Sequence, residues 1–334
     1  MRERKLSLAA FAVLAAIGTG CAGGAVRATL DNPTPVDIAK LWQDPVDLAS
    51  RDLFHGPGGP ALRPDGSTPF AFVAADRTGF SSGYDVSGPD GTIWSVKLGP
   101  EAQPEVVVSR ILWAIGYHQP PTYYLETWTM TGAQAGPQPA GRFRPGLPER
   151  ELVAEWSWYE NDFVATQPFK GLVTANLLLN NWDWKTSNNK VYQVRQAEPG
   201  APTRLHVVQD LGASLGRTSY PKIMSWFPMR GLGQGSRNDI DGFEQQDFIK
   251  RVDGDRVEFH YRGIHRPVVD SLTARDVVWT CELMSRLTDA QWQGAFRAAG
   301  YPPDHAGRYI RKIKQKIGEG LALAPGGTRP TGGA

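Results

Sequence analysis

Two short polar stretches contain the residues that are best suited to chemistry. The first, NWDWKTSN from Asn181 to Asn188, spaces a carboxylate at Asp183, a cation at Lys185 and a carboxamide at its end. The second is Asp210, a lone carboxylate that follows an apolar run and precedes Leu-Gly. Phosphoryl transfer needs such a set: one carboxylate orients or deprotonates the acceptor hydroxyl, and a carboxamide and a second carboxylate hold Mg²⁺. The residue types therefore indicate phosphoryl transfer to a hydroxyl group.

The elements around these stretches are expected to bring them together. Residues 172–180 (LVTANLLLN) are typical of the end of a buried helix that leads into the first stretch. Residues 190–195 and 204–209 are predicted strands, and the Glu-Pro-Gly-Ala-Pro turn at 198–202 joins them. The expected order is a helix, a loop, a hairpin and an acidic turn at Asp210.

That order resembles the catalytic loop and the Asp-Phe-Gly turn of the protein-kinase-like superfamily. The motif Asp-x-Lys-x-x-Asn at 183–188 followed by Asp-Leu-Gly at 210–212 carries the resemblance. Its Asn-x-Asp opening is more similar to atypical branches, of the HipA type or secreted-kinase-like, than to His-Arg-Asp enzymes. The resemblance implies an α+β, bilobal protein-kinase-like fold, with a small strand-rich N-lobe and a larger, mainly helical C-lobe.

The resemblance also implies a role for each residue. Asp183 would orient the acceptor hydroxyl, and Lys185 would neutralise charge on the transferred phosphoryl group. Asn188 and Asp210 would coordinate Mg²⁺ or Mn²⁺, and Asn189 would replace Asn188 if the loop shifts by one residue. ATP or another nucleoside triphosphate would be the co-substrate. A surface turn rich in Asp, Lys and Asn is the ordinary alternative.

The first half of the chain is expected to supply the nucleotide site. Residues 92–98 (TIWSVKL) alternate as a strand, and the Gly-Pro-Asp-Gly turn at 88–91 pairs them with residues 84–87. The resemblance implies that Lys97 contacts the nucleotide phosphates and that Ser95 lies beside the base. A turn with Gly79 and Gly83 takes the place of the phosphate-covering loop, although it departs from Gly-x-Gly-x-x-Gly. A solvent-facing strand lysine is the alternative for Lys97.

A helix is predicted over 103–116, because Pro104 suits its first turn and Gly116 its end. Glu105 lies on the apolar face of this helix. The resemblance implies that Glu105 pairs with Lys97, and Glu101 is the rival partner. A glutamate in the first turn also interacts favourably with the helix dipole and needs no further role.

The N-terminus has the features of an export signal. Basic residues at 2, 4 and 5 precede an apolar run over 6–17, and small residues lead to Cys21. Residues 1–20 resemble a bacterial lipoprotein signal peptide, which implies that Cys21 is lipidated. The protein is then expected in the bacterial cell envelope, anchored to a membrane.

Composition excludes several other classes of protein. Cys21 and Cys281 are the two cysteines of the chain, so no disulfide framework is expected, and Cys281 fits a small buried side chain in a helix. A net charge of +2 does not indicate nucleic-acid binding. His260 and His265 have no metal-site spacing.

The sequence divides into a tether with a short helix (21–50), an N-lobe (51–128), a Pro/Gly-rich hinge followed by a C-lobe (129–323) and a disordered tail (324–334). Residues 217–242 fit an irregular, substrate-facing segment. Helices are predicted over 273–287, 288–299 and 303–321, with Thr273 and Thr288 as N-caps. The last helix carries a basic stripe, interpreted as a solvated face or a contact for anionic headgroups or glycans. The stripe consists of Arg308, Arg311, Lys312, Lys314 and Lys316.

The sequence thus favours an exported atypical kinase whose hydroxyl acceptor is a protein, a glycan or a small molecule, and whose oligomeric state is open. The alternative is a non-catalytic kinase-fold binding module of the cell envelope, because little ATP is expected in the bacterial periplasm. A metal-dependent hydrolase is a third class.

Overall fold

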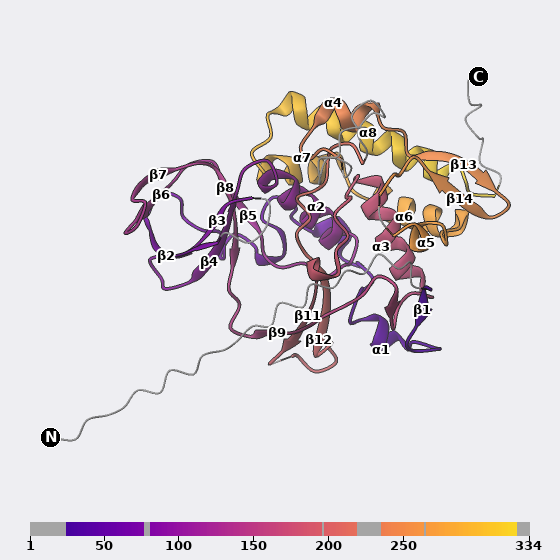
Figure 1. The fold of residues 1–334 in the computed structure, drawn as a ribbon, viewed down its shortest axis with the longest axis horizontal. Helices are drawn as coiled ribbons and strands as arrows, with labels where there is room; N and C mark the ends of the chain where they lie inside the picture. Colours follow the sequence, from indigo (N-terminus) through magenta and orange to yellow (C-terminus); the bar gives the residue numbers. More distant parts are fainter. Residues whose placement is uncertain (1–24, 77–80, 196, 219–234, 264, 326–334) are drawn as a thin grey trace, which may run out of the picture.

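The computed structural model describes residues 25–76, 81–195, 197–218, 235–263 and 265–325. A curled sheet forms one lobe and a mainly helical body forms the other, and helix α2 lies between them (Figure 1). This confirms the expected α+β fold with a smaller strand-rich lobe and a larger helical lobe.

The small lobe is a seven-stranded sheet with the strand order β5-β8-β4-β3-β2-β6-β7. Neighbouring strands are antiparallel except for the parallel pair β2 and β6. The strands are β2 (Phe70–Asp76), β3 (Gly83–Ser87), β4 (Ile93–Leu98), β5 (Tyr123–Leu125), β6 (Trp128–Thr131), β7 (Gly136–Gln138) and β8 (Gly141–Pro145).

Because side chains alternate across a strand, the two faces of this sheet differ. One face encloses an apolar core made by Phe70, Val86, Trp94, Val96, Tyr123, Leu125, Trp128, Met130 and Phe143. The opposite face of β4 presents Ser95 and Lys97, the positions between those buried residues. The predicted strand over 92–98 is therefore confirmed, with Lys97 on its polar face.

Helix α2 (Ala102–Ala114) is the predicted helix of the first half of the chain. It is buried on nearly all sides, because it contacts β5 and β8 of the sheet and also α7 of the large lobe. A helix enclosed in this way is apolar around its whole circumference, as the residues from Val106 to Ala114 largely are. Glu105, in its first turn, is buried with it.

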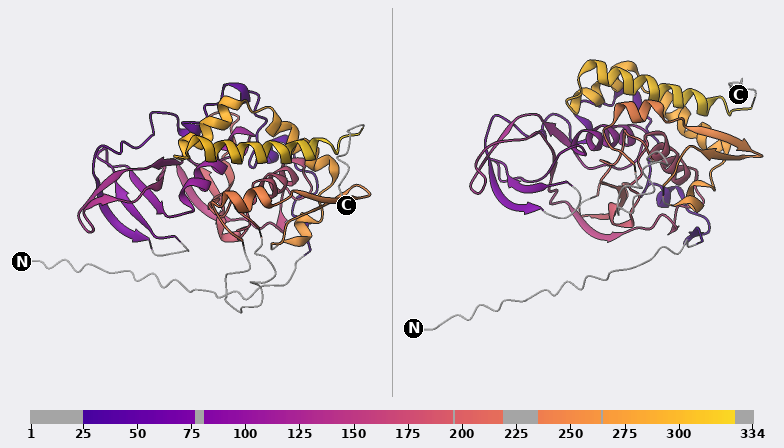
Figure 2. Two further views of the ribbon diagram at one scale, coloured as in Figure 1. Left: turned by 90° about the horizontal axis from the view of Figure 1, so that it is seen from above. Right: turned by 45° about the horizontal axis from the view of Figure 1, so that its top comes forward.

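The large lobe is built around α3 (Gln167–Leu178), which packs against α6 and α8. Helix α8 lies along the outside of this lobe, next to α4 and α7 (Figure 2). Thr273 and Thr288 form capping boxes at the starts of α6 and α7, as predicted. The further helices are α4 (Ile240–Gln245), α5 (Arg266–Val269), α6 (Ala274–Ser285), α7 (Asp289–Ala298) and α8 (Pro303–Leu321).

A second, three-stranded sheet has the strand order β12-β11-β9 and contains the predicted hairpin. In the sequence, β9 precedes α3, and β11 and β12 follow it. Its strands are β9 (Arg150–Glu155), β11 (Asn189–Val194) and β12 (Arg204–Val208). The smaller elements are β1 (Arg27–Ala28), α1 (Pro35–Ile38), β10 (Glu160–Asn161), β13 (Ile249–Asp253), β14 (Arg256–Phe259) and 3₁₀ turns at Leu48–Ser50, Gly56–Gly58 and Thr186–Asn188. Within the described residues, no helix combines the length and the apolar composition that a membrane crossing requires.

The predicted hinge over 129–151 is wrong. These residues form most of β6, all of β7 and β8, and the start of β9. Met130 and Phe143 are fully buried in the core of the small lobe, so that lobe extends to Pro145 and not to residue 128. Most prolines and glycines of this stretch lie in turns between strands or in the edge strand β7, where a missing backbone donor costs little, and Gly141 and Pro145 are the first and last residues of β8.

The interpretation of the basic stripe on α8 as a solvated face is wrong for two of its five members. Lys316 has no exposed surface and Lys312 is buried, whereas Lys314 lies on the outside. Cys281 is buried and unpaired, as predicted, and burial raises the pKa of its thiol to about 12.

Several predictions fall outside the described residues. They are the signal peptide, Cys21, Gly79, residues 219–234 of the irregular segment, and the tail from residue 326 onward.

Candidate functional site

The ammonium of Lys97 is the centre of the candidate site. Its Nζ lies 3.2 Å from Glu105 Oε2 and 3.6 Å from Glu101 Oε2, and it also donates a hydrogen bond to Asp210 Oδ1. The first two partners come from the start of α2, and the third comes from the large lobe. One cation therefore joins the sheet, the helix and the segment that follows the hairpin.

Glu105 is the preferred partner of Lys97 on two grounds. It is the nearer of the two glutamates, and its side chain is 1% exposed, so no water competes for it. Its other oxygen, Oε1, forms an ion pair with Arg142 Nε at 3.1 Å and accepts a hydrogen bond from Arg144, and both arginines lie on β8. Burial alone would raise the pKa of Glu105, but Arg142, Lys97 and Arg144 outweigh it and lower this pKa to about 2. Glu105 is thus held as a carboxylate by three cations.

The pKa of Lys97 also reflects a balance between burial and neighbouring charges. Burial opposes the charge on Lys97, but Glu105 and Asp210 raise the pKa of the ammonium above its ordinary value. Glu101, the rival, is bonded instead to Ser81 Oγ at 2.8 Å and to Arg237. It therefore joins the start of α2 to the far end of the irregular segment.

Asp210 follows β12 with a positive φ of 58°, a conformation that side-chain-bearing residues adopt rarely. This turn directs its half-exposed carboxylate toward Lys97. The glycine two residues later is needed for packing, because a Cβ on Gly212 would lie 2.5 Å from Cβ of Glu101. The Asp-Leu-Gly sequence is thereby explained by a close approach of this turn to α2. A strained conformation at a polar residue is also a frequent property of functional sites.

The loop with Asp183 begins where α3 ends, at Asn180, which has a φ of 54°. Hydrogen bonds fix its course: Asn181 Nδ2 donates to Asn176 Oδ1 at 2.7 Å, and Asn188 Nδ2 donates to the backbone oxygen of Asp183 at 2.8 Å. The loop is therefore held from both of its ends. The carboxylate of Asp183 is largely buried and lies 2.9 Å from Lys185 Nζ, which is exposed.

Strand register places Asn188 opposite Gln209, the residue before Asp210. Asn189 pairs with Val208 at the end of the β11–β12 ladder, and the amide of Gln209 donates to the backbone oxygen of Asn188 at 2.8 Å. Asn188 and Asp210 therefore lie at the same end of this ladder, Asn188 directly before β11 and Asp210 two residues after β12. Asn189 has no exposed surface, so its side chain is less accessible to a ligand than that of Asn188; its Nδ2 donates to the backbone oxygen of Trp156, and its Oδ1 has no hydrogen-bond partner among the described residues.

Asn188 and Asp210 carry oxygens of the kinds that a magnesium ion prefers. In the described part of the chain, no donor reaches Asn188 Oδ1, and Lys97 is the partner of the Asp210 carboxylate. An amide oxygen and a carboxylate are hard ligands of the kind Mg²⁺ prefers, and Mg²⁺ commonly takes one or two protein ligands together with phosphates and water. No group of three or more His, Cys, Asp and Glu residues suited to a metal occurs among the described residues. Zinc-type coordination is not indicated there.

Two of the remaining predicted nucleotide-site residues, Gly83 and Ser95, lie on the strands β3 and β4. Gly83 begins β3 opposite Lys97, and a Cβ there would lie 2.4 Å from the backbone oxygen of Val96, so close strand packing explains this glycine. Ser95 shares the polar face of β4 with Lys97 and pairs with Arg144 on β8. Gly79 lies outside the described residues.

Sequence reasoning missed the two arginines of β8. Arg142 and Arg144 contact Glu105, and Arg144 also donates to Gln209 Oε1 at 3.1 Å, next to Asp210. A second bond, from Gln209 Nε2 to the Tyr192 hydroxyl at 2.6 Å, continues this chain into β11. The alternation Arg-Phe-Arg in residues 142–144 is the signal that could have identified a strand with one cationic face.

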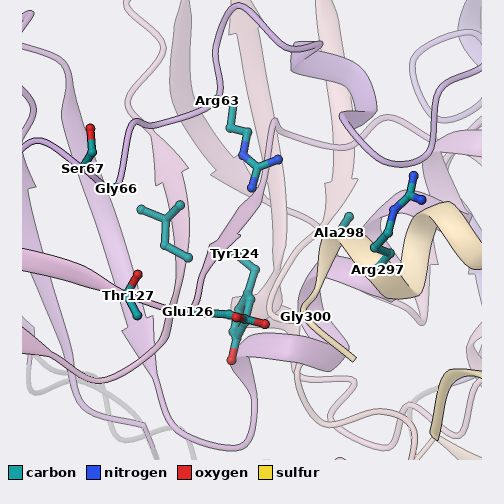
Figure 3. Close-up of a pocket in the computed structure, with 10 residues that line it drawn as sticks. Arg63, Gly66, Ser67, Tyr124, Glu126, Thr127, Arg297, Ala298 and Gly300 are labelled. Atoms are coloured by element: carbon teal, nitrogen blue, oxygen red, sulfur yellow. The ribbon is translucent and has the colours of Figure 1, made fainter. Parts of the chain in front are cut away.

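A separate pocket of about 390 Å³ is lined by residues of β5, of the turn at residues 63–67 and of the end of α7 (Figure 3). Arg63 and Arg297 line it, and each guanidinium also stacks near the ring of Phe54, at 5.2 and 4.8 Å from its centroid. None of the candidate residues from Lys97 to Asp210 lines this pocket. It is not part of the site described above.

Comparisons with known proteins find a likeness in structure but none in sequence. No protein-family model and no curated protein matches the sequence. A crystal structure of a Helicobacter pylori proinflammatory kinase, CtkA, is similar over 74% of this chain and 98% of that chain, with 11% identity and a TM-score of 0.29.

A curled sheet with a lysine strand, a buried helix that pairs with this lysine, and a hairpin that ends in an acidic turn form an α+β arrangement that is consistent with a bilobal protein-kinase-like fold.

Proposed function

We propose that this protein is an atypical kinase of the HipA-type or secreted-kinase-like branch. It transfers a phosphoryl group from ATP or another nucleoside triphosphate to a hydroxyl group of a protein, a glycan or a small molecule. The observation that supports this most directly is the meeting of Lys97 with Glu105 and Asp210 across two lobes. A fixed cation beside an acidic turn is the arrangement that positions nucleotide phosphates for transfer.

The proposal gives each residue of the site a role. Lys97, held by Glu105, contacts the nucleotide phosphates in exchange for part of its contact with Asp210. Asn188 and Asp210 would hold Mg²⁺ or Mn²⁺, which supplies positive charge to the phosphate oxygens when it is bound. Asp183, on a loop fixed at both ends, orients the acceptor hydroxyl and accepts its proton, and the exposed Lys185 neutralises charge on the group in transfer.

The proposal includes export and membrane anchoring. The basic start, the apolar run over 6–17 and Cys21 are the features of a lipoprotein signal. Acylation of Cys21 would attach the protein to a membrane of the bacterial envelope.

A specific observation favours the alternative, a non-catalytic binding module. The charged side chains of the site already satisfy one another, because Lys97 pairs with Asp210 and Lys185 pairs with Asp183. A module that never binds nucleotide could keep these pairs for stability alone.

Binding of nucleotide separates the two functions. The thermal stability of the purified protein is measured with ATP, GTP, CTP and UTP, each with Mg²⁺, with Mn²⁺ or with EDTA. Because a ligand that binds the folded state raises its stability, a kinase gains stability with at least one metal–nucleotide pair. The variant Asp210→Asn should lose the metal-dependent part of that gain, whereas Asp253→Asn on the exposed β13 should keep it. A folded protein that responds to no nucleotide supports the binding module.

A further inference from the structure

A buried lysine lies directly behind the loop that carries Asp183. Lys316 extends from α8 into the large lobe, and its Nζ donates to the backbone oxygen of Leu178 at 3.1 Å and to Asn180 Oδ1 at 2.9 Å. The same nitrogen lies 4.2 Å from the centroid of the Phe243 ring. No carboxylate forms an ion pair with it among the described residues.

Such a lysine needs an explanation, because a buried ammonium costs several kcal/mol unless its donors are all satisfied. An ammonium has three donors, and here two oxygens and the face of one aromatic ring receive them. The backbone oxygens at the end of α3 also carry the partial negative charge of the helix terminus. A side chain of similar length without charge, such as methionine, would fill the space at lower cost, so packing alone does not account for Lys316.

The hydrogen-bond partners of Lys316 lie at the start of the loop that contains Asp183. Asn180 is the residue with positive φ at which α3 ends, and its Nδ2 donates to the backbone oxygen of Gly216 at 2.7 Å. Two backbone hydrogen bonds lie on either side of this contact: Leu215 donates to Leu179 at 3.0 Å and Trp182 donates to Ala213 at 3.2 Å. The Asn180 side chain therefore sits between the start of the Asp183 loop and the segment that follows Asp210.

We propose that Lys316 is a positioning residue that fixes, through Asn180, both the loop containing Asp183 and the segment after Asp210. It touches neither the reacting groups nor a nucleotide. Its ammonium holds the Asn180 amide in one orientation, with the oxygen toward α8 and the nitrogen toward Gly216. The last helix of the chain thereby sets the relative position of the two acidic stretches. The activity of these stretches rests on the proposed function, but their positioning does not.

The contact does not depend on one protonation state of Lys316. Burial, together with Lys312, lowers the pKa of Lys316 below its ordinary value, whereas Glu319 and Asp247 oppose this effect. A neutral amine retains two N–H donors, which is the number that the oxygens of Leu178 and Asn180 require. The positioning role is therefore expected across the pH range in which the protein is folded.

Hydrogen exchange tests the positioning directly and needs no enzyme activity. Lys316→Met removes the donors and keeps the length of the side chain, and Lys314→Met, on the exposed side of the same helix, is the matched control. The amides of Trp182 and Leu215 should exchange about tenfold faster in Lys316→Met than in wild type, because local opening becomes easier there. Exchange in β4 and α2 should be unchanged, and Lys314→Met should match wild type throughout. Unchanged exchange at both amides, or an equal increase over the whole large lobe, would overturn the proposal.

A second variant covers the case in which Lys316→Met does not fold. Asn180→Gly removes the amide and tolerates the positive φ. In this variant the amides of Trp182 and Leu215 should also exchange faster than in wild type. Unchanged exchange at these two amides would overturn the proposal.

Where both variants fold, phosphoryl transfer gives an independent test through a double-mutant cycle. Lys316→Met and Asn180→Gly should each lower kcat by about tenfold or more with nucleotide affinity near that of wild type, and the double variant should be little worse than either one. Additive effects overturn the proposal. If wild type transfers no phosphate, the proposed kinase activity fails, and hydrogen exchange alone decides the role of Lys316.

Discussion

The Lys97 ammonium lies 3.2 Å from Glu105 Oε2, and the other oxygen of this carboxylate contacts two arginines of β8. The glutamate is therefore a shared anion for three cations, and not the partner of a single lysine. Its removal leaves three cations close together in a buried place, which costs more than the loss of one hydrogen bond.

The first prediction compares the two glutamates of α2. Glu105→Gln should lower the free energy of unfolding by about 3–5 kcal/mol, as is typical when one partner of a buried ion pair is removed. It should also abolish the stabilisation by nucleotide, because Lys97 loses its fixed position. Glu101→Gln should affect nucleotide binding less, since Glu101 Oε2 is farther from Lys97 at 3.6 Å. Urea unfolding and nucleotide thermal shifts measure both effects.

A surface glutamate supplies the control for this comparison. Glu282→Gln on the exposed side of α6 should change the free energy of unfolding by less than about 0.5 kcal/mol. If Glu101→Gln instead proves the more damaging variant, the assignment of Glu105 as the partner of Lys97 is wrong.

The second prediction concerns pH. The pKa of Glu105 falls from 4.5 to about 2 on folding, because Arg142, Lys97 and Arg144 outweigh the opposing effect of burial. The unfolded chain thus binds a proton at this group before the folded protein does. The stabilisation is fully present above about pH 4.5 and is lost as the pH falls toward 2, a change that corresponds to about 3 kcal/mol.

The free energy of unfolding at pH 7, 5, 4 and 3 in wild type and in Glu105→Gln measures this effect. The difference between the two proteins should shrink as the pH falls. A difference that stays constant over this range would show that the ionisation of Glu105 is not linked to folding.

The local elements of the site could be predicted from the sequence, because their signals are local. The alternation around Lys97, the apolar face that carries Glu105, and the capping residues Thr273 and Thr288 each lie within a few residues of the feature they specify. The pairing of the hairpin that ends at Asp210 follows in the same way from two strand patterns and a turn.

The strand β8 and the burial of Lys316 could not be predicted from the sequence, because both depend on contacts between distant segments. The strand with Arg142 and Arg144 was hidden by neighbouring prolines and glycines, and it is stable as a strand because β4 and β5 pair with it on both sides. Lys316 repeats a helical basic pattern that a solvated face would also produce. The helical period places Lys316, but not Lys314, on the face of Ile313. A lysine at the edge of an apolar face commonly extends its ammonium to water, so the burial of Lys316 is decided by α3 and α4, which pack against α8.

The third prediction concerns the anchor. Cys21→Ser should leave an uncleaved precursor or move the protein out of the membrane fraction, because acylation of the cysteine holds the protein there. Cys281→Ser, at the buried cysteine, should not change the fractionation. Immunoblots of membrane and soluble fractions measure this. Identical migration and fractionation of Cys21→Ser and wild type would replace lipidation with a simple signal peptide.

The last prediction separates chemistry from binding. Asp183→Asn keeps the shape of the side chain but removes the charge that orients the hydroxyl and accepts its proton. Phosphoryl transfer should therefore fall by about 10²-fold or more, whereas nucleotide affinity should remain near that of wild type. Lys97→Ala should weaken both, because its contact with the phosphates is made before and during transfer. Lys250→Ala, on the exposed hairpin strand β13, is the control and should change neither.

Transfer of radiolabelled phosphate to the protein itself or to an envelope extract measures activity, and nucleotide titration measures affinity. A defect in Asp183→Asn that is confined to affinity would place Asp183 in the nucleotide site and not beside the acceptor. Equal transfer by Asp183→Asn and wild type would exclude the proposed mechanism while leaving the kinase-like fold intact, because the fold depends on the buried contacts of Glu105 and α3 and not on this carboxylate.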